Sequence, residues 1–201
     1  MAKRLGLTNG DVIELRCNGA TVEAPVWILP GQADRCVTVH LGYGRWEAGG
    51  TGNHCGFDAY RLRDSSTPWL AAGLEIKKTG RRRELATTQH HHSMEGRDII
   101  KVATVANFRA NPHFAASKLR TKPSLVPEAP PLGLGRYAWG MTVDLSTCTG
   151  CSACVTACQA ENNIPVVGRE QVLANRERHW IRMDRYFAGA PDGPRMLHQP
   201  V

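Results

Sequence analysis

Four cysteines lie within eleven residues at the spacing C-x2-C-x2-C-x3-C, as Cys148, Cys151, Cys154 and Cys158. Thiolates are soft ligands that suit iron–sulfur clusters and zinc, and this spacing is found in ferredoxins that carry 4Fe–4S clusters. Cysteines two residues apart on a tight loop can reach three corners of one cluster. Gly150 tolerates a positive φ, which lets backbone N–H groups approach the sulfide ions. We therefore expect all four thiols to be metal ligands and Gly150 to contribute to cofactor binding.

The fourth cysteine is expected to have a different role from the first three. From Cys154 the sequence is typical of a helix, so Cys158 lies one turn further on and is aimed elsewhere. In ferredoxins with two clusters, the fourth cysteine of such a run binds the other cluster. A zinc knuckle or four reduced structural thiols are the alternatives, although zinc sites more often use two well-separated C-x2-C pairs.

The elements around the cysteines are those of a partial ferredoxin-type module, which we assign to residues 137–201. Residues 139–145 read as a short strand that leads into the cysteine loop. Pro165 ends the helix, and residues 166–175 read as a connector. Residues 179–187 alternate well enough to form a second strand, which is expected to pair with the first.

The first part of the chain, residues 1–117, is expected to be a β-barrel or orthogonal sheet with a trailing segment. Residues 11–17 show a strand pattern, Asn18-Gly19 is a strong hairpin-turn signal, and residues 20–28 form the return strand. Residues 36–41 alternate again and predict another strand.

A closing hairpin with Gly80 in its loop is expected over residues 74–83. A helical period follows within residues 99–119, interrupted by Pro112. Residues 118–136 are rich in proline and predict an extended linker between the two units. The predicted fold class is thus mainly β with an α+β tail.

Two other segments carry residues that could do chemistry. Residues 42–56 are rich in glycine and could bring backbone amides close to a phosphate, but they match no established phosphate-binding motif, and a turn-rich loop explains them equally well. Adjacent side chains such as His54 and Cys55 rarely reach one metal ion together. In the run from His90 to His92 only the first and third could share a metal site, and a polar segment that contacts a partner is the preferred interpretation.

Composition limits the classes of partner without choosing among them. The chain has 201 residues, a net charge of +7 and seven cysteines. A basic surface suits nucleic acid, an anionic membrane or an acidic redox protein. The run from Arg81 to Arg83 lacks interleaved aromatic residues and reads as a solvated turn, so we expect no nucleic-acid partner. The sequence contains neither an apolar run of transmembrane length nor the apolar core of a signal peptide.

The cysteine segment is similar to electron-transfer subunits of the dimethyl-sulfoxide-reductase type, in which the same spacing is followed by a motif matching Gln159-Ala-Glu161-Asn162. Other stretches of the sequence narrow the resemblance to the iron–sulfur subunit of bacterial alternative complex III. The stretches that carry it are residues 88–97, 139–141 and 175–187. Residues 5–12 and 24–31 resemble the dinucleotide-binding β-barrel of molybdopterin enzymes.

This resemblance implies an iron–sulfur subunit that passes electrons from a quinol-oxidising integral membrane subunit towards a multihaem cytochrome c. It implies association with the membrane through these partners, at the periplasmic face. It also implies that the pterin is no longer bound and that the barrel has become a scaffold. Further clusters are expected from sequence beyond Val201, so we expect the chain to be an internal piece of a longer reading frame, truncated at both ends. The alternative is that Cys158 closes the first cluster locally.

Two competing functions are kept beside the electron-transfer hypothesis. In the first, the chain is part of a catalytic molybdopterin oxidoreductase, with residues 42–56 contacting the dinucleotide. In the second, the four cysteines hold zinc and stabilise an interaction module. Metal and acid-labile sulfide analysis separates the second from an iron–sulfur protein.

Overall fold

A computed structural model describes residues 1–97, 99–116 and 140–189, together with the backbone of residues 195–200. Its first unit is an antiparallel three-stranded sheet in the order β2-β1-β3, made of β1 (Asp11–Cys17), β2 (Ala20–Pro25) and β3 (Glu75–Arg82). The hairpin between β1 and β2 turns at Asn18 and Gly19, whose φ angles of 51° and 73° are both positive. Two positive φ values in a two-residue loop match the right-handed twist of the flanking strands, and they confirm the predicted turn.

β3 corrects the prediction for residues 74–83. No hairpin forms there, because Gly80 lies inside one continuous strand that pairs with β1 along its other edge. The register shifts between Asp11, opposite Arg82, and Ile13, opposite Lys78, so β3 bulges at this point. Gly80 adopts a φ of 81° in the bulge, where its lack of a side chain is needed.

One face of this sheet carries the small core. Strict alternation places Ile13, Leu15 and Cys17 on the buried side of β1, and Val22 and Ala24 of β2 join them. Leu62, in the single helical turn Ala59–Leu62, covers these residues. Another helical turn, Ala2–Leu5, precedes the sheet. Segregation of apolar residues to one face is what orients the sheet.

The expected barrel is not seen among the described residues, in which the three strands form an open sheet. The predicted strand at residues 36–41 is wrong, since this segment is irregular and lines two cavities of about 430 and 540 Å³ beside the sheet. Residues 26–28, predicted to continue β2, are also outside the strand.

Beyond the sheet, the chain contains the short helix α1 (Val105–Ala110). Thr104 caps it by accepting a hydrogen bond at its hydroxyl from Asn107 N–H, and the helix ends before Pro112. This confirms a helix within residues 99–119. The predicted linker at residues 118–136 lies outside the described residues.

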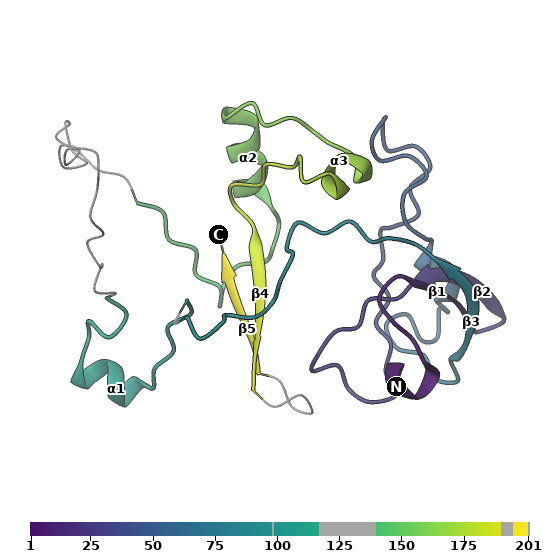
Figure 1. The fold of residues 1–201 in the computed structure, drawn as a ribbon, viewed down its shortest axis with the longest axis horizontal. Helices are drawn as coiled ribbons and strands as arrows, with labels where there is room; N and C mark the ends of the chain where they lie inside the picture. The colour runs from purple at the N-terminus through teal and green to yellow at the C-terminus, as the bar shows by residue number, and fades with distance from the viewer. Residues whose placement is uncertain (98, 117–139, 190–194, 201) are drawn as a thin grey trace.

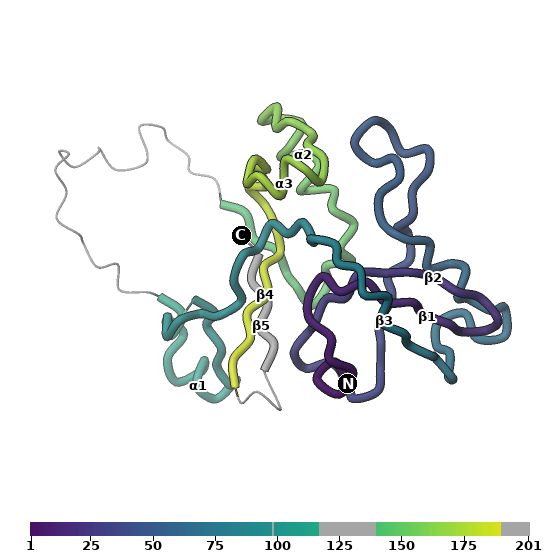
Figure 2. The backbone as a smooth tube through the Cα atoms, turned by 45° about the vertical axis from the view of Figure 1, so that its right-hand side comes forward, coloured from purple at the N-terminus to yellow at the C-terminus, as the bar shows by residue number. Residues whose placement is uncertain are grey.

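The last unit contains α2 (Ala153–Glu161), α3 (Arg169–Leu173) and an antiparallel hairpin of β4 (Met183–Ala188) and β5 (Arg195–Pro200). The predicted pairing of residues 139–145 with 179–187 is wrong, because residues 140–145 form no strand and β4 pairs with β5. α3 also occupies part of the predicted connector. After β3 the chain runs beside β4, as both the ribbon and the tube views show (Figure 1, Figure 2). This segment connects the sheet of the first unit to the unit that contains β4.

Candidate metal centre

The cysteine loop is shaped by a turn at Asp144. Its carboxylate accepts a hydrogen bond from Ser146 N–H at 2.9 Å, and its carbonyl accepts one from Cys148 N–H at 2.9 Å. Two residues later Gly150 has a φ of 70°, and a Cβ there would meet no atom within 4 Å. Gly150 is therefore required for its backbone conformation rather than for space.

The loop then turns into α2. Ser152 occupies the N-cap with a φ of 61°, and its carbonyl accepts a hydrogen bond from Thr156 N–H at 2.9 Å. Cys154 therefore lies in the first turn of α2 and Cys158 one turn later, as expected. The Cys148, Cys151 and Cys154 side chains are exposed, whereas that of Cys158 is half-buried. The first three thiols thus differ in environment from the fourth.

Two polar side chains lie beside Cys158 and its neighbour in α2, and the sequence pattern alone assigned neither a role. Asn162 donates from its amide to the carbonyl of Cys158 at 2.9 Å and also lies 3.6 Å from its Sγ. Gln159 places its amide nitrogen 3.2 Å from Nδ1 of His179. Hydrogen bonds to sulfur are one of the means by which proteins set the potential of an iron–sulfur cluster. The i, i+4 spacing of Cys158 and Asn162 on a helix could have revealed the first contact.

The donor set fits a thiolate-bound cluster, since all seven cysteines are free and four lie in this loop and helix. Within the described part of the chain, no three His, Cys, Asp or Glu side chains lie close enough together to hold a metal ion. The loop therefore supplies the right ligands at the right spacing, and a bound group would have to draw them together. Such coupling of metal binding to local folding is common in small metal sites.

The glycine-rich segment 42–56 folds on itself instead of forming an open cradle. The N–H groups of Gly44 and Arg45 donate to the carbonyl of Cys55, and His54 N–H donates to the carbonyl of Arg45. A Cβ on Gly44 would lie 2.7 Å from Asp58 N, and one on Gly56 would lie 2.8 Å from Tyr43 Cβ. Gly44 and Gly56 thus permit a close backbone crossing, and the amides of Gly44, Arg45 and His54 are occupied by hydrogen bonds within the segment.

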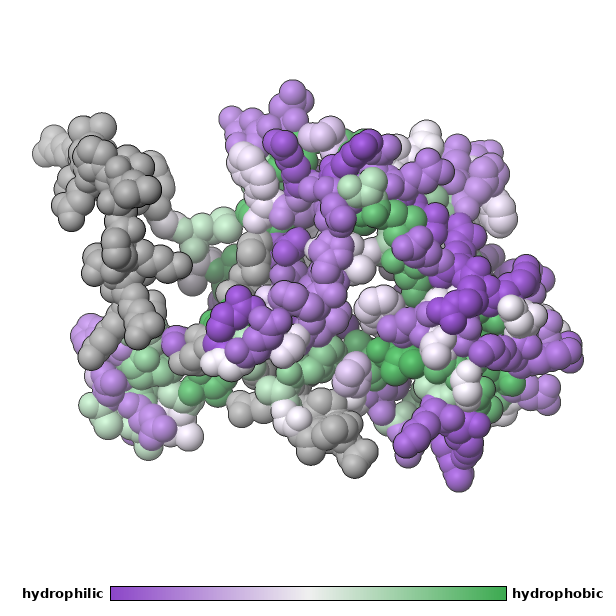
Figure 3. Space-filling view, viewed as in Figure 1, coloured by the Kyte–Doolittle hydropathy of each residue, from purple (hydrophilic) through white to green (hydrophobic). Residues whose placement is uncertain are grey.

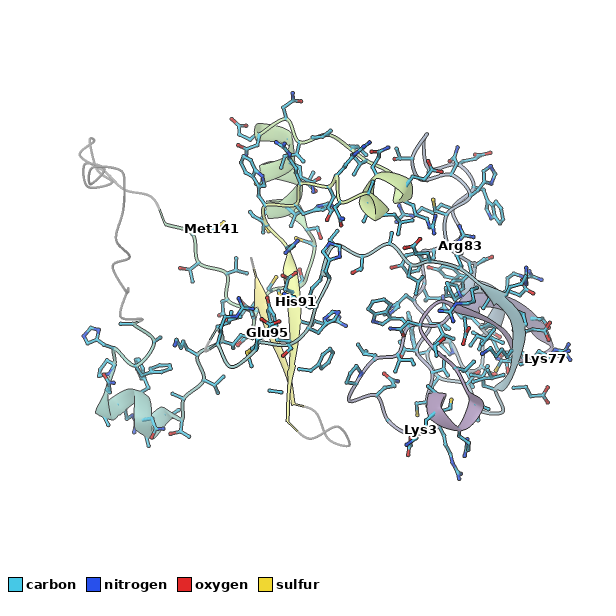
Figure 4. The ribbon with its side chains drawn as sticks, viewed as in Figure 1. Lys3, Lys77, Arg83, His91, Glu95 and Met141 are labelled. Atoms are coloured by element: carbon cyan, nitrogen blue, oxygen red, sulfur yellow. The ribbon has the colours of Figure 1, made fainter. Side chains whose placement is uncertain are left out.

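The histidine run contacts this chain's own β4. Nδ1 of His92 is 3.1 Å from the carbonyl of Arg185, and its ring packs against Trp27 and Phe187. His90 and His91 are exposed, and His91 lies beside the β4–β5 hairpin (Figure 4). From the sequence, we interpret this run as a segment that contacts a partner. In the described residues, His92 instead contacts β4 of the same chain.

The basic residues near Arg81 belong to β3, and several have acidic partners. Asp11 pairs with both Lys78 and Arg82, and Glu23 pairs with Arg81. Hydrophilic side chains cover much of this side of the molecule (Figure 3). The predicted solvated turn is thus an edge strand whose charges are partly neutralised, which is a common way to protect a sheet edge.

Among the described residues, no helix is both long enough and apolar enough to span a bilayer. Residues 139–160 match the model of the family described as 4Fe-4S binding domain. Over 29 residues the chain is 73% identical to the "Menaquinone reductase, iron-sulfur cluster-binding subunit" of Nitratidesulfovibrio vulgaris (strain Hildenborough), a match that covers 14% of this chain and 11% of that protein. The cysteine segment is accordingly a 4Fe–4S binding segment, of the kind found in iron–sulfur electron-transfer proteins.

Proposed function

We propose that the chain is an electron-transfer component of a membrane-associated quinol:acceptor oxidoreductase and performs no bond chemistry of its own. The coincidence of the four-cysteine loop and helix with the 4Fe–4S binding segment carries this proposal. The short identity to a menaquinone reductase subunit supports a setting in a quinone-linked complex. Because that match covers only 11% of the relative, the activity of the relative's complex is proposed for this chain and is not shown by the match.

In this proposal the four cysteines bind two different clusters. Cys148, Cys151 and Cys154, which are exposed on the loop and the first turn of α2, bind one cluster. Cys158, one turn on and half-buried, binds a neighbouring cluster supplied from outside the described residues. When bound, a 4Fe–4S cluster supplies one-electron redox chemistry, and the protein sets its potential within a span of roughly −700 to +450 mV. Asn162 contributes to the potential of the cluster that Cys158 binds, through its contact with the Cys158 sulfur.

The partners follow from the resemblance described above. A quinol-oxidising integral membrane subunit delivers electrons, and a multihaem cytochrome c subunit receives them. The chain is held at the periplasmic face of the membrane by these subunits. The β-rich first unit serves as a scaffold, and the closed conformation of residues 42–56 supports a function without bound molybdopterin.

A second direction of electron flow is favoured by the name of the relative, which is a menaquinone reductase subunit. In that case electrons pass through the cluster towards menaquinone. Mixing the assembled complex with menaquinol distinguishes the two. Reduction of the cluster by menaquinol supports the first direction, whereas reoxidation of the pre-reduced cluster by menaquinone alone supports the second.

The cluster itself is tested by Cys151→Ser, with Cys55→Ser as the matched control because Cys55 lies outside the motif and its Sγ faces backbone carbonyls. We expect Cys151→Ser to abolish the iron, the acid-labile sulfide and the dithionite-bleached visible absorption of the cluster that this loop holds, whereas Cys55→Ser retains all three. Zinc without iron or sulfide in the purified protein would contradict the proposal.

The role of Cys158 needs a separate variant in the assembled complex. Cys158→Ser is expected to leave the electron paramagnetic resonance signal of the cluster held by Cys148, Cys151 and Cys154 and to remove that of its neighbour. Loss of the same signal in Cys158→Ser and Cys151→Ser would show instead that Cys158 is the fourth ligand of one cluster.

A further inference from the structure

One side chain occupies both backbone polar groups of a residue on β4. The amide of Gln89 donates from Nε2 to the carbonyl of Arg185 at 2.7 Å, and its Oε1 accepts from Arg185 N–H at 3.0 Å. The same Nε2 lies 3.1 Å from the carbonyl of His91. A carboxamide has the donor and acceptor of a peptide group, so Gln89 pairs with β4 as a neighbouring strand would.

The outer edge of β4 is the one that Gln89 occupies. In an antiparallel pair, the N–H and C=O of one residue point to the same side, and alternate residues point to opposite sides. Arg185 faces Gln89, and Phe187, two residues on, donates its N–H to the carbonyl of His92 at 2.9 Å. The intervening residues of β4 pair with β5. β4 is thus held between β5 and residues 88–92. We call residues 88–92 the clasp.

Further contacts of the clasp connect the two units. Arg182 donates to the carbonyl of Thr88 at 2.9 Å, and the His92 ring lies between Trp27, which follows β2, and Phe187 of β4. Nδ1 of His92 lies 3.1 Å from the Arg185 carbonyl, to which the tautomer protonated at Nδ1 can donate. The clasp therefore attaches the hairpin that follows the cysteine helix to the sheet of the first unit.

The chain also connects β4 to the cysteine segment. His179, four residues before β4, contacts Gln159 of α2, which is adjacent to Cys158. A second attachment lies nearby, where Arg169 at the start of α3 donates to the carbonyl of Glu84. Displacement of β4 would thus shift the helix that carries Cys154 and Cys158 relative to the first unit.

From this arrangement we propose that Gln89 is a positioning residue, whose amide substitutes for a strand and fixes the cluster-bearing unit against the sheet of the first unit. The inference rests on the proposed function, because a fixed orientation matters for electron transfer only if the cysteine segment carries a cluster. Distance and orientation between redox centres govern transfer, so a loosened clasp slows electron delivery without altering the cluster itself.

The test uses three variants of the cluster-loaded chain. Gln89→Met keeps the length of the side chain and removes both hydrogen-bonding groups. Gln89→Glu keeps the acceptors when ionised and regains a donor only when protonated. His90→Ala is the matched control, since the side chain of this clasp residue is exposed and no contact of it with β4 is seen in the described structure.

Amide hydrogen exchange at Arg185 and Phe187 reports directly on the clasp. In Gln89→Met we expect protection of these amides to fall roughly twofold to tenfold, the usual effect of losing one hydrogen bond, with His90→Ala unchanged. In Gln89→Glu the ionised carboxylate still accepts from Arg185 N–H but cannot donate to the Arg185 carbonyl. We therefore expect a smaller loss of protection, which should be recovered as the pH falls towards the carboxyl pKa, ordinarily about 4.3. The other titratable or charged groups at this site are His92, Arg182 and the buried Asp184 that pairs with Arg182. Gln89→Met corrects for their influence because they are present in both variants.

Electron delivery in the assembled complex provides the second measurement. We expect Gln89→Met to slow it severalfold while the reduction potential and electron paramagnetic resonance spectrum of the cluster stay unchanged. Unchanged amide protection in Gln89→Met, or lost protection without slower electron delivery, would overturn the proposal. Absence of any cluster in the wild-type chain would instead refute the proposed function, and hydrogen exchange would still report on the clasp.

Discussion

Asp11 shows how much of the first unit depends on a single buried carboxylate. It is 2% exposed, accepts hydrogen bonds from Thr8 N–H and Thr8 Oγ1 at 2.8 and 3.1 Å, and lies 2.9 Å from Lys78 Nζ. The hydrogen bond from Thr8 N–H, followed by that from Lys78, lowers the pKa of Asp11 from 3.8 to about 2. Since Asp11 is the first residue of β1 and Lys78 belongs to β3, this carboxylate joins the sheet edge to the preceding turn.

A lowered pKa in the folded state makes the stability of the sheet depend on pH. The contribution of ionised Asp11 is fully present above its ordinary pKa of 3.8 and is lost as the pH falls through about 2. We expect Asp11→Asn to be less stable than the wild type at neutral pH, and the difference to shrink through that acid window. Denaturant unfolding of the cluster-free chains, followed by circular dichroism, measures it. A difference that stays constant down to the lowest pH would show that charge at Asp11 is not the cause.

At the level of elements, local turn chemistry was predictable and long-range pairing was not. Asn18-Gly19 requires two positive φ values, which these two residues adopt readily, so the β1–β2 hairpin follows from its own sequence. The helix that carries Cys154 is equally local, and it ends at Glu161, where Asn162 is the C-cap and Asn163 has a φ of 49°. These parts depend on neighbours along the chain.

The errors concern partners that are distant in sequence. Gly80 and its basic neighbours indicate a turn, yet the unpaired edge of β1, some sixty residues earlier, stabilises a strand with a bulge there. Residues 36–41 alternate like a strand but have no strand partner in the described part of the chain. The pattern of β4 is recognisable, but its partner is not. At the candidate site, spacing predicts the cysteines and Gly150 as ligand-binding residues, whereas contacts such as Gln89 with Arg185 leave no periodic signal.

Two glycines with the same φ angle allow the cost of backbone strain to be distinguished from that of crowding. Gly19 and Gly44 both have a φ of 73°, but a Cβ on Gly19 would meet nothing within 4 Å, whereas one on Gly44 would lie 2.7 Å from Asp58 N. We expect Gly19→Ala to lower the free energy of unfolding by about 1–2 kcal/mol, the cost of a left-handed conformation. Gly44→Ala should cost more, because the backbone of residues 57–58 must also move. Equal effects in denaturant unfolding of the two variants would contradict this assignment.

For the whole molecule, the net charge of +7 is the property most relevant to association. Part of the basic charge is satisfied internally, since Asp11 and Glu23 pair with Lys78, Arg82 and Arg81. Lys77 near the start of β3 and Arg83 just after its end are both exposed (Figure 4), and no internal ion pair is seen for either in the described structure. These two residues are therefore free to attract an acidic redox partner.

Electrostatic attraction of this kind predicts a strong dependence on salt. Steering by opposite charges raises association rates by roughly 10- to 1000-fold, and the Debye length shrinks from about 30 Å at 0.01 M to about 8 Å at 0.15 M ionic strength. We therefore expect the second-order rate constant for electron transfer to an acidic partner to fall at least about tenfold over this range. Lys77→Gln with Arg83→Gln, which lowers the net charge from +7 to +5, should reduce both the rate at low salt and its salt dependence. Glu75→Gln, an exposed neutralisation of opposite sign on β3, should raise the rate slightly. Stopped-flow measurement of cluster oxidation compares them, and a rate that does not change with ionic strength would mean that the basic surface takes no part in docking.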